Sequence, residues 1–186
     1  VEGALDVKEP DMRIVGLFAE IVDEKIAEIV HAMMFMNETN KMETDESKRK
    51  DIEFYLSTYG GTADDMFALY DTMKLIQKTT DISVIGLGKV MSAGVLILAG
   101  GTHGKRKVGR NCRIMLHSVV GGNQGSLHNL INEMEAIQDL QKMYINRLVE
   151  ETKMTKNQLK KMLEQKVNIY LSAEQAVEYG IADEII

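Results

Sequence analysis

Tryptophan is absent from the sequence, proline and cysteine each occur once, and aromatic residues make up only 5% of the chain. The lone cysteine, Cys112, has no partner for an internal disulfide, so we expect a reducing, cytoplasmic environment. Residues 1–6 do not combine a basic segment with an apolar one, and we therefore expect no secretory signal there.

Long apolar runs and an excess of positive charge are missing too. The longest weakly polar run, residues 93–101, is far shorter than the stretch of about 20 residues that crosses a bilayer as a helix. The 22 basic and 28 acidic residues give a formal net charge of −6, which is unlike the basic surface of a duplex-binding protein. Neither a membrane nor a nucleic acid is expected as a partner.

The residues that are present suit a single α/β domain over residues 1–186. With 45% hydrophobic residues, the chain can bury a full core. Strand-like runs alternate with helical periodicity, and this order favours a sheet with parallel pairing. The predicted strands are 13–18, 52–56, 82–87, 104–108 and 112–116, and the polar stretch 37–51 is predicted to be mostly a solvated connection.

A long helix is predicted over residues 126–152, which contain neither glycine nor proline. Its apolar residues keep a 3–4 spacing that only Gln141 interrupts. At about 1.5 Å per residue this helix is about 40 Å long, which is more than one small domain needs to cover its core. We therefore expect a handle, defined as residues 119–152, that protrudes or packs on a partner.

Ser92 lies between a hydrophobic strand and a buried helix, and the small residues Ala93 and Gly94 follow it. A hydroxyl there sits at a helix N-terminus, close to backbone N–H groups, where a substrate can approach. The same position suits an ordinary helix N-cap, which is a frequent role of serine. Spacing alone therefore leaves both the nucleophile and the cap open.

His117 ends an apolar strand and precedes a glycine-rich loop, and α/β folds place reactive groups at such strand ends. By itself it also fits an ordinary histidine at the rim of a sheet. Together with Ser92 it forms the pair that acyl transfer needs, a hydroxyl and a base that accepts its proton. Gly60 and Gly61 could supply N–H donors for an oxyanion, or form a plain turn.

Six ordered segments carry a more specific pattern. They are Tyr70-Asp71-Thr72-Met73, Met91-Ser92-Ala93-Gly94, Ala99-Gly100-Gly101-Thr102 with Gly104-Lys105-Arg106, Arg113-Ile114-Met115-Leu116-His117, Gly121-Gly122-Asn123-Gln124-Gly125, and Leu171-Ser172-Ala173-Glu174 with Glu178-Tyr179-Gly180. In order and spacing they resemble the proteolytic subunit of the Clp protease (ClpP), a family of self-compartmentalised serine peptidases, over about residues 13–186. The resemblance implies the ClpP/crotonase-like fold: stacked, parallel-rich β-sheets surrounded by helices, with a protruding handle helix.

The resemblance also implies roles for individual residues. Ser92 matches the nucleophile and His117 the general base, while the backbone N–H groups of Gly61 and Ala93 match the oxyanion donors. The family holds an extended substrate by strand addition, which reads main-chain groups and tolerates many sequences. The matching substrate-binding residues here are Thr62, Ala63, Ser118, Val119 and Val120.

Two adjacent positions depart from the family. The triad aspartate falls on Asn168, and the preceding arginine, which takes part in contacts between rings, falls on Val167. An asparagine oxygen can accept the hydrogen bond from the histidine Nδ1–H but brings no charge. We therefore expect catalysis to be weakened but not necessarily lost.

The partners implied by the resemblance are copies of the chain in a heptameric ring, also stacked as 14 subunits, peptide substrates, and an AAA+ unfoldase; no cofactor and no metal are implied. Tyr55 matches an aromatic of the family's docking pocket for the unfoldase. Residues 1–12, the insertion at 41–50 and Tyr59 in place of a proline differ from the family, so docking stays open.

A second hypothesis from the same residues is a weakly active or non-catalytic subunit that assembles into mixed rings and modulates a partner protease. Asn168 and Val167 favour it, whereas Ser92 and His117 favour the peptidase. Acyl-CoA chemistry on a related fold does not require this Ser–His pair. A Ser–Lys dyad that uses Lys89, on the strand-to-turn segment before Ser92, also fits less well.

Overall fold

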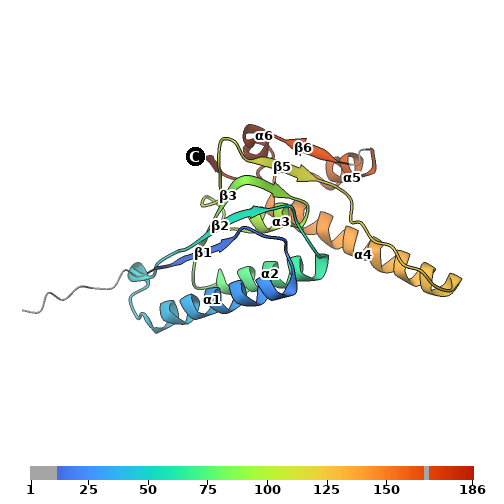
Figure 1. The fold of residues 1–186 in the computed structure, drawn as a ribbon. Helices are drawn as coiled ribbons and strands as arrows, with labels where there is room; N and C mark the ends of the chain where they lie inside the picture. Colours follow the sequence, from blue (N-terminus) through green and yellow to red (C-terminus); the bar gives the residue numbers. More distant parts are fainter. Residues whose placement is uncertain (1–11, 166–167) are drawn as a thin grey trace, which may run out of the picture.

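The computed structural model describes residues 12–165 and 168–186, in which strands and helices alternate along the chain (Figure 1). The strands are β1 Ile14–Leu17, β2 Ile52–Thr58, β3 Ile82–Met91, β4 Lys107–Val108, β5 Arg113–Leu116, β6 Ile169–Leu171 and β7 Glu184–Ile185. The α-helices are α1 Asp23–Met42, α2 Ala63–Ile76, α3 Ala93–Ala99, α4 Leu127–Glu151, α5 Lys156–Gln165 and α6 Ala173–Glu178.

The described strands form one sheet that branches at β3. Strands β1, β2, β3, β4 and β7 are neighbours in this order and all pair in parallel. The last residues of β3 pair in parallel with β5 instead, and β5 pairs antiparallel with β6. The predicted α/β architecture with a parallel-rich sheet is confirmed, and where the family pattern suggested stacked sheets, the strands join through β3.

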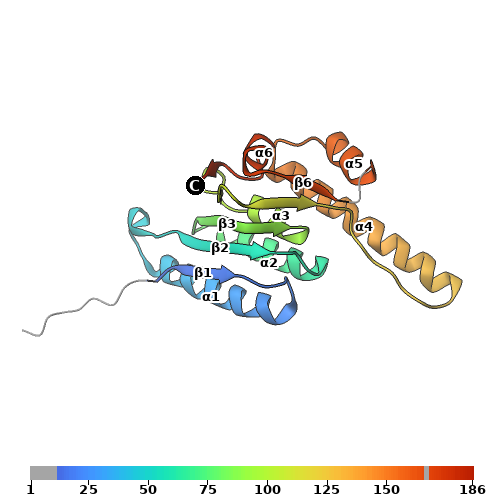
Figure 2. The ribbon, with the colours of Figure 1, turned by 45° about the horizontal axis from the view of Figure 1, so that its top comes forward.

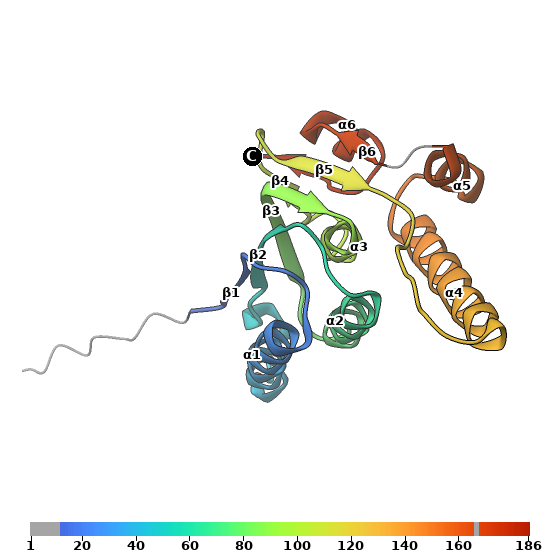
Figure 3. The ribbon, with the colours of Figure 1, turned by 45° about the vertical axis from the view of Figure 1, so that its right-hand side comes forward.

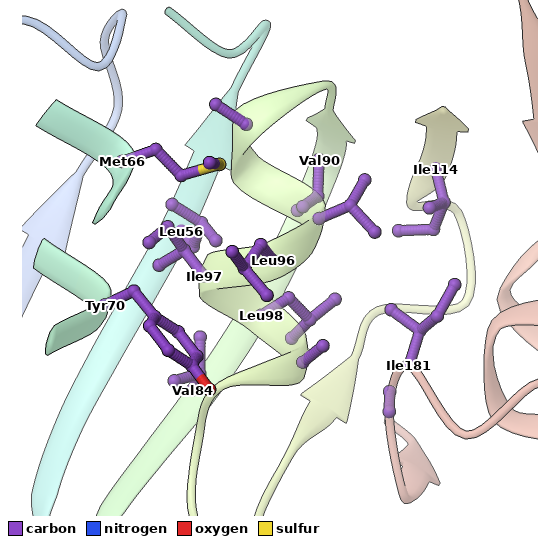
Figure 4. Close-up of a cluster of buried hydrophobic side chains, with 14 of the residues drawn as sticks. Leu56, Met66, Tyr70, Val84, Val90, Leu96, Ile97, Leu98, Ile114 and Ile181 are labelled. Carbon is purple, nitrogen blue, oxygen red and sulfur yellow. The ribbon is translucent and has the colours of Figure 1, made fainter. Parts of the chain in front are cut away.

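The core lies around α3, which is buried along its whole length. Helices α1 and α2 lie side by side along the β1–β2 part of the sheet (Figures 1 and 3). Helix α3 packs between α2 and β3, so it presents apolar side chains in more than one direction. Figure 4 shows its leucine and isoleucine side chains among Leu56, Met66, Tyr70, Val84, Val90, Ile114 and Ile181.

Helix α4 is the predicted long helix, and it begins where Ser126 Oγ accepts a hydrogen bond from the Asn129 N–H. Its C-terminal half packs on the core through Tyr144, Ile145 and Leu148. Its N-terminal half extends past the sheet (Figure 2) and leaves apolar side chains in solvent, for example Met134 with 61% of its surface exposed. The expectation that this helix protrudes therefore holds in the structure.

The prediction for residues 37–51 was partly wrong, because α1 continues to Met42. Two of its polar residues, Asn37 and Asn40, are buried. The Asn40 amide donates to Thr80 Oγ1 at 2.8 Å, and the Thr80 hydroxyl donates to Asn37 Oδ1 at 2.9 Å. The asparagines thus satisfy one another through Thr80, so their polarity does not mark a loop. Residues 44–48 are exposed, as predicted.

The predicted strand 104–108 is also shorter, since only Lys107 and Val108 pair. The N–H groups of Gly104 and Arg106 donate to the Asp183 carboxylate instead of a neighbouring strand. The buried Arg106 guanidinium donates to both Asp183 oxygens and to the Glu151 carbonyl, which ties the end of α4 to the sheet. Burial opposes ionisation of Asp183, but these hydrogen bonds outweigh it and lower its pKa to about 2.

Candidate active site

Ser92 sits in a strained turn between β3 and α3. Its φ of 55° and ψ of −121° make it the one described non-glycine residue with positive φ. Such a conformation costs on the order of 1–3 kcal/mol and persists where surrounding contacts impose it. Here the Ser92 N–H donates to the Met115 carbonyl at 2.7 Å, and the Tyr144 hydroxyl donates to the Ser92 carbonyl at 3.0 Å.

The Ser92 side chain makes no capping hydrogen bond to α3, although the residue occupies the N-cap position. The alternative of an ordinary N-cap therefore loses its main support. A strained serine whose hydroxyl is not used by its own helix is typical of a nucleophile presented at a strand–helix turn.

Gly60 and Gly61 stand beside this turn, and both need to be glycine. Gly60 has φ 107°, and a Cβ added there would lie 2.7 Å from the Ser92 Cβ and 3.1 Å from its hydroxyl oxygen. A Cβ on Gly61 would lie 2.0 Å from the Ile21 carbonyl oxygen. A side chain at position 60 would collide with Ser92, and a side chain at position 61 would collide with the backbone of Ile21.

The N–H of Gly61 faces away from Ile21. Ile21 donates to the Gly60 carbonyl at 2.8 Å and accepts from the Thr62 N–H at 3.0 Å, which forms a parallel bridge to Gly61. In a parallel bridge of this kind, the N–H and C=O of the central residue point to the opposite side. The Ala93 N–H is likewise unused within α3, because the first N–H groups of a helix have no partner inside it.

His117 directly follows β5, and its ring is half-buried. Its Nδ1 lies 2.5 Å from the Ser118 carbonyl oxygen. A carbonyl oxygen only accepts, so this hydrogen bond requires a proton on Nδ1, and in the neutral ring the lone pair is then on Nε2. His117 is therefore in the tautomer that a general base needs.

Asn168 is exposed and immediately precedes β6. The antiparallel register pairs Leu116 with Ile169, and extending it by one residue places His117 opposite Asn168. Among the described residues, no hydrogen bond joins the two side chains, and the His117 Nδ1 bonds to the Ser118 carbonyl oxygen instead. Val167, the other departure from the family pattern, lies outside the described residues.

A pocket of about 600 Å³ brings the predicted residues together, with the exception of Asn168. Ser92, Ala93, Gly61, His117 and the proposed substrate-binding residues Thr62, Ala63, Ser118, Val119 and Val120 all line it. The rest of the lining includes an apolar part, with Val22, Ile137 and Leu140, and the acidic residues Glu20, Asp64 and Glu133.

Tyr144 is the residue that the sequence did not single out for the site. Its ring is buried within the apolar face of α4, and its hydroxyl ends at the Ser92 carbonyl. Burial raises its pKa, so the hydroxyl stays protonated and continues to donate. A buried tyrosine generally brings its hydroxyl to a polar partner, which is the signal that could have marked it.

A strained serine, a histidine that can act as a base and two backbone N–H groups with no partner among the described residues line one pocket, and these are the groups that a serine hydrolase uses. The comparison with protein families agrees, because the family model described as Clp protease matches residues 8–186. The chain belongs to the Clp protease family, as its six segments indicated. None of the helices in the described residues is long and apolar enough to cross a membrane.

Proposed function

We propose that the protein is a serine endopeptidase subunit that cleaves peptides and unfolded polypeptides inside a ring-shaped chamber. The observation that carries this proposal is the strained Ser92, which shares one pocket with His117 and with the N–H groups of Gly61 and Ala93. Membership of the Clp protease family supports it independently.

The reaction begins when Ser92 Oγ attacks the scissile carbonyl and gives its proton to His117 Nε2. The tetrahedral oxyanion accepts hydrogen bonds from the N–H groups of Gly61 and Ala93. His117 then donates the proton to the leaving amine, the C–N bond breaks, and an ester to Ser92 remains. Water, deprotonated by His117, hydrolyses this ester and restores the serine.

The substrate binds as an extended strand between two main-chain segments of the pocket. One is Thr62-Ala63 at the start of α2, and the other is Ser118-Val119-Val120 after β5. Binding through main-chain groups gives little dependence on substrate sequence. This suits a chamber that degrades many unfolded chains.

Peptide hydrolysis without nucleotide tests the proposed function. The sequence has no phosphate-binding Gly-Lys-Ser/Thr loop, so the chain does not supply unfolding work. We expect the purified protein to cleave short fluorogenic peptides at a rate that ATP does not change, and to leave a folded substrate intact. ATP hydrolysis that persists through further purification, or degradation of the folded substrate by the chain alone, would contradict the proposal.

Ring assembly is expected from the apolar surface of the handle. Leu127, Leu130, Ile131 and Met134 are each at least 39% exposed, which is costly for a free monomer. Copies of α4 packed between two heptameric rings would cover them. Analytical ultracentrifugation at micromolar concentration should show heptamers or 14-subunit particles, with heptamers well populated because the inter-ring arginine of the family is Val167 here. Monomers at all concentrations would overturn the assembly.

A mixed ring with a more active subunit is the second candidate, and Asn168 favours it. Native mass measurements with and without partner subunits distinguish mixed from uniform rings.

Docking of an AAA+ unfoldase is also a proposal, in which Tyr55 would take part. Tyr55 is half-buried on β2 and its hydroxyl donates to Glu53 at 3.1 Å. A cytoplasmic location fits these partners.

A further inference from the structure

The segment that follows β5 is held by hydrogen bonds from three directions. The His117 Nδ1–H donates to the Ser118 carbonyl at 2.5 Å, and the Ser118 hydroxyl donates to the Leu163 carbonyl of α5 at 2.9 Å. The Val119 N–H donates to the side-chain oxygen Oε1 of Gln141 on α4 at 2.8 Å. All three fix the backbone immediately after the candidate general base.

Two of these bonds act on the same peptide group. The Ser118 carbonyl and the Val119 N–H belong to one planar unit and point in opposite directions. The hydrogen bond from the Val119 N–H to Gln141 therefore fixes the direction of the Ser118 carbonyl. This carbonyl oxygen accepts the hydrogen bond from the His117 Nδ1–H. The order of contacts is Gln141 Oε1, Val119 N–H, Ser118 C=O and His117 Nδ1–H.

The position of Gln141 in the sequence gives an independent reason to look for a role. It interrupts the apolar spacing of α4 between Ile137 and Tyr144, both of which line the pocket. The structure places Gln141 half-buried beneath the segment, where its oxygen accepts the Val119 N–H. An apolar side chain would continue the stripe but leave this N–H without a protein partner.

We propose that Gln141 is a positioning residue, which holds the Ser118–Val119 peptide so that the Ser118 carbonyl keeps the proton of His117 on Nδ1. In the family, the triad aspartate selects the histidine tautomer by direct contact. Here Gln141 selects it indirectly, through the neutral Ser118–Val119 peptide. It brings no charge, so the stabilisation of the imidazolium is not replaced. This inference rests on the proposed peptidase function for its kinetic consequence, but the tautomer can be measured without it.

The test compares three variants in the assembled protein. Gln141→Met keeps the length of the side chain and removes the acceptor, whereas Gln141→Glu keeps an acceptor oxygen. Gln138→Met makes the same change one turn earlier on α4, at an exposed residue that shares the groove beside Ser118 but makes no hydrogen bond within the described residues. Thermal melting and native mass confirm folding and assembly. If Gln141→Met does not assemble, Gln141→Asn replaces it, because the shorter side chain should not reach Val119.

The first measurement is the tautomer of His117 in protein with 15N-labelled imidazole nitrogens and no substrate. The chain has four histidines, so the signal is assigned by its loss in His117→Gln. We expect Nδ1–H in the wild type, in Gln141→Glu and in Gln138→Met, and a mixture with Nε2–H in Gln141→Met. The same tautomer in all four proteins would overturn the proposal, whether or not the protein hydrolyses peptides.

The second measurement separates kcat from KM for a short peptide. Loss of one net hydrogen bond corresponds to a decrease of about fivefold to tenfold in kcat for Gln141→Met. We expect a KM close to the wild-type value, recovery to within about threefold in Gln141→Glu, and no change in Gln138→Met. A decrease in Gln138→Met as large as in Gln141→Met, or a change confined to KM, would mean that α4 packing or substrate contact is responsible instead.

Discussion

Replacing Ser92 by alanine is expected to lower peptide hydrolysis by at least about 10³-fold, because no other described group is placed to form the acyl-enzyme. The fold should survive, since alanine keeps the Cβ that already tolerates φ 55° and the side chain makes no capping bond. The measurement is kcat/KM on a fluorogenic peptide, together with native mass to show intact assembly.

Ser47→Ala is the matched control for this variant. Ser47 is exposed, interacts with Asp45 in the connection after α1, and does not line the pocket. Its activity should equal that of the wild type. If Ser92→Ala retained more than about a tenth of the wild-type activity in assembled protein, a different nucleophile would carry the reaction.

Replacing Asn168 by aspartate is expected to raise kcat by about tenfold. In a chymotrypsin-type triad the opposite change costs about 10⁴, in part because the asparagine holds the histidine in the wrong tautomer. Here the Ser118 carbonyl already holds the proton on Nδ1, so only the missing charge remains to be restored. About one factor of ten corresponds to 1.4 kcal/mol of added imidazolium stabilisation.

The pH–rate profile gives a second readout for the same variant. A carboxylate opposite the ring favours the charged imidazolium, so His117 keeps its extra proton to higher pH and the base form appears later. The acidic limb of the profile should therefore move to higher pH in Asn168→Asp. Asn157→Asp, which adds the same charge at an exposed residue of α5, should leave the profile in place.

Two outcomes for Asn168→Asp would contradict the account in different ways. An unchanged rate and profile with intact rings would mean that position 168 does not act on His117, against the register of β5 and β6. A gain of several orders of magnitude would mean that the wild-type histidine rests in the wrong tautomer, against its hydrogen bond to Ser118.

The sequence was sufficient for the first five strands and the long helix after them, because apolar periodicity reports burial directly, but it did not predict the short strands β6 and β7. It failed where polar residues are buried in pairs, as at Asn37 and Asn40, and where glycine sits inside a strand. Strand β3 continues through Gly86 and Gly88 to Met91, beyond the predicted end at residue 87. Its register against β2 shifts between Leu56 and Thr58, and no local sequence pattern reports such a shift.

In the candidate site too, some features were predictable from local sequence and others depend on contacts between distant segments. Ser92, His117 and Gly61 were predicted from local sequence and from the resemblance, and all three line one pocket. The hydrogen bonds of Tyr144 and Gln141 depend on where α4 packs beside α3 and α5, and the strain at Ser92 depends on contacts that distant segments supply. These two hydrogen bonds join residues 52 and 22 positions apart, and no local pattern in a single sequence reports them.

The central claim, that Ser92 is the nucleophile, is tested most directly by intact-mass analysis after treatment with a serine-directed phosphonate. The account predicts one adduct per subunit, on the peptide that contains Ser92, and none in Ser92→Ala. An adduct that persists in Ser92→Ala, or one that maps to another residue of the wild-type protein, would contradict it.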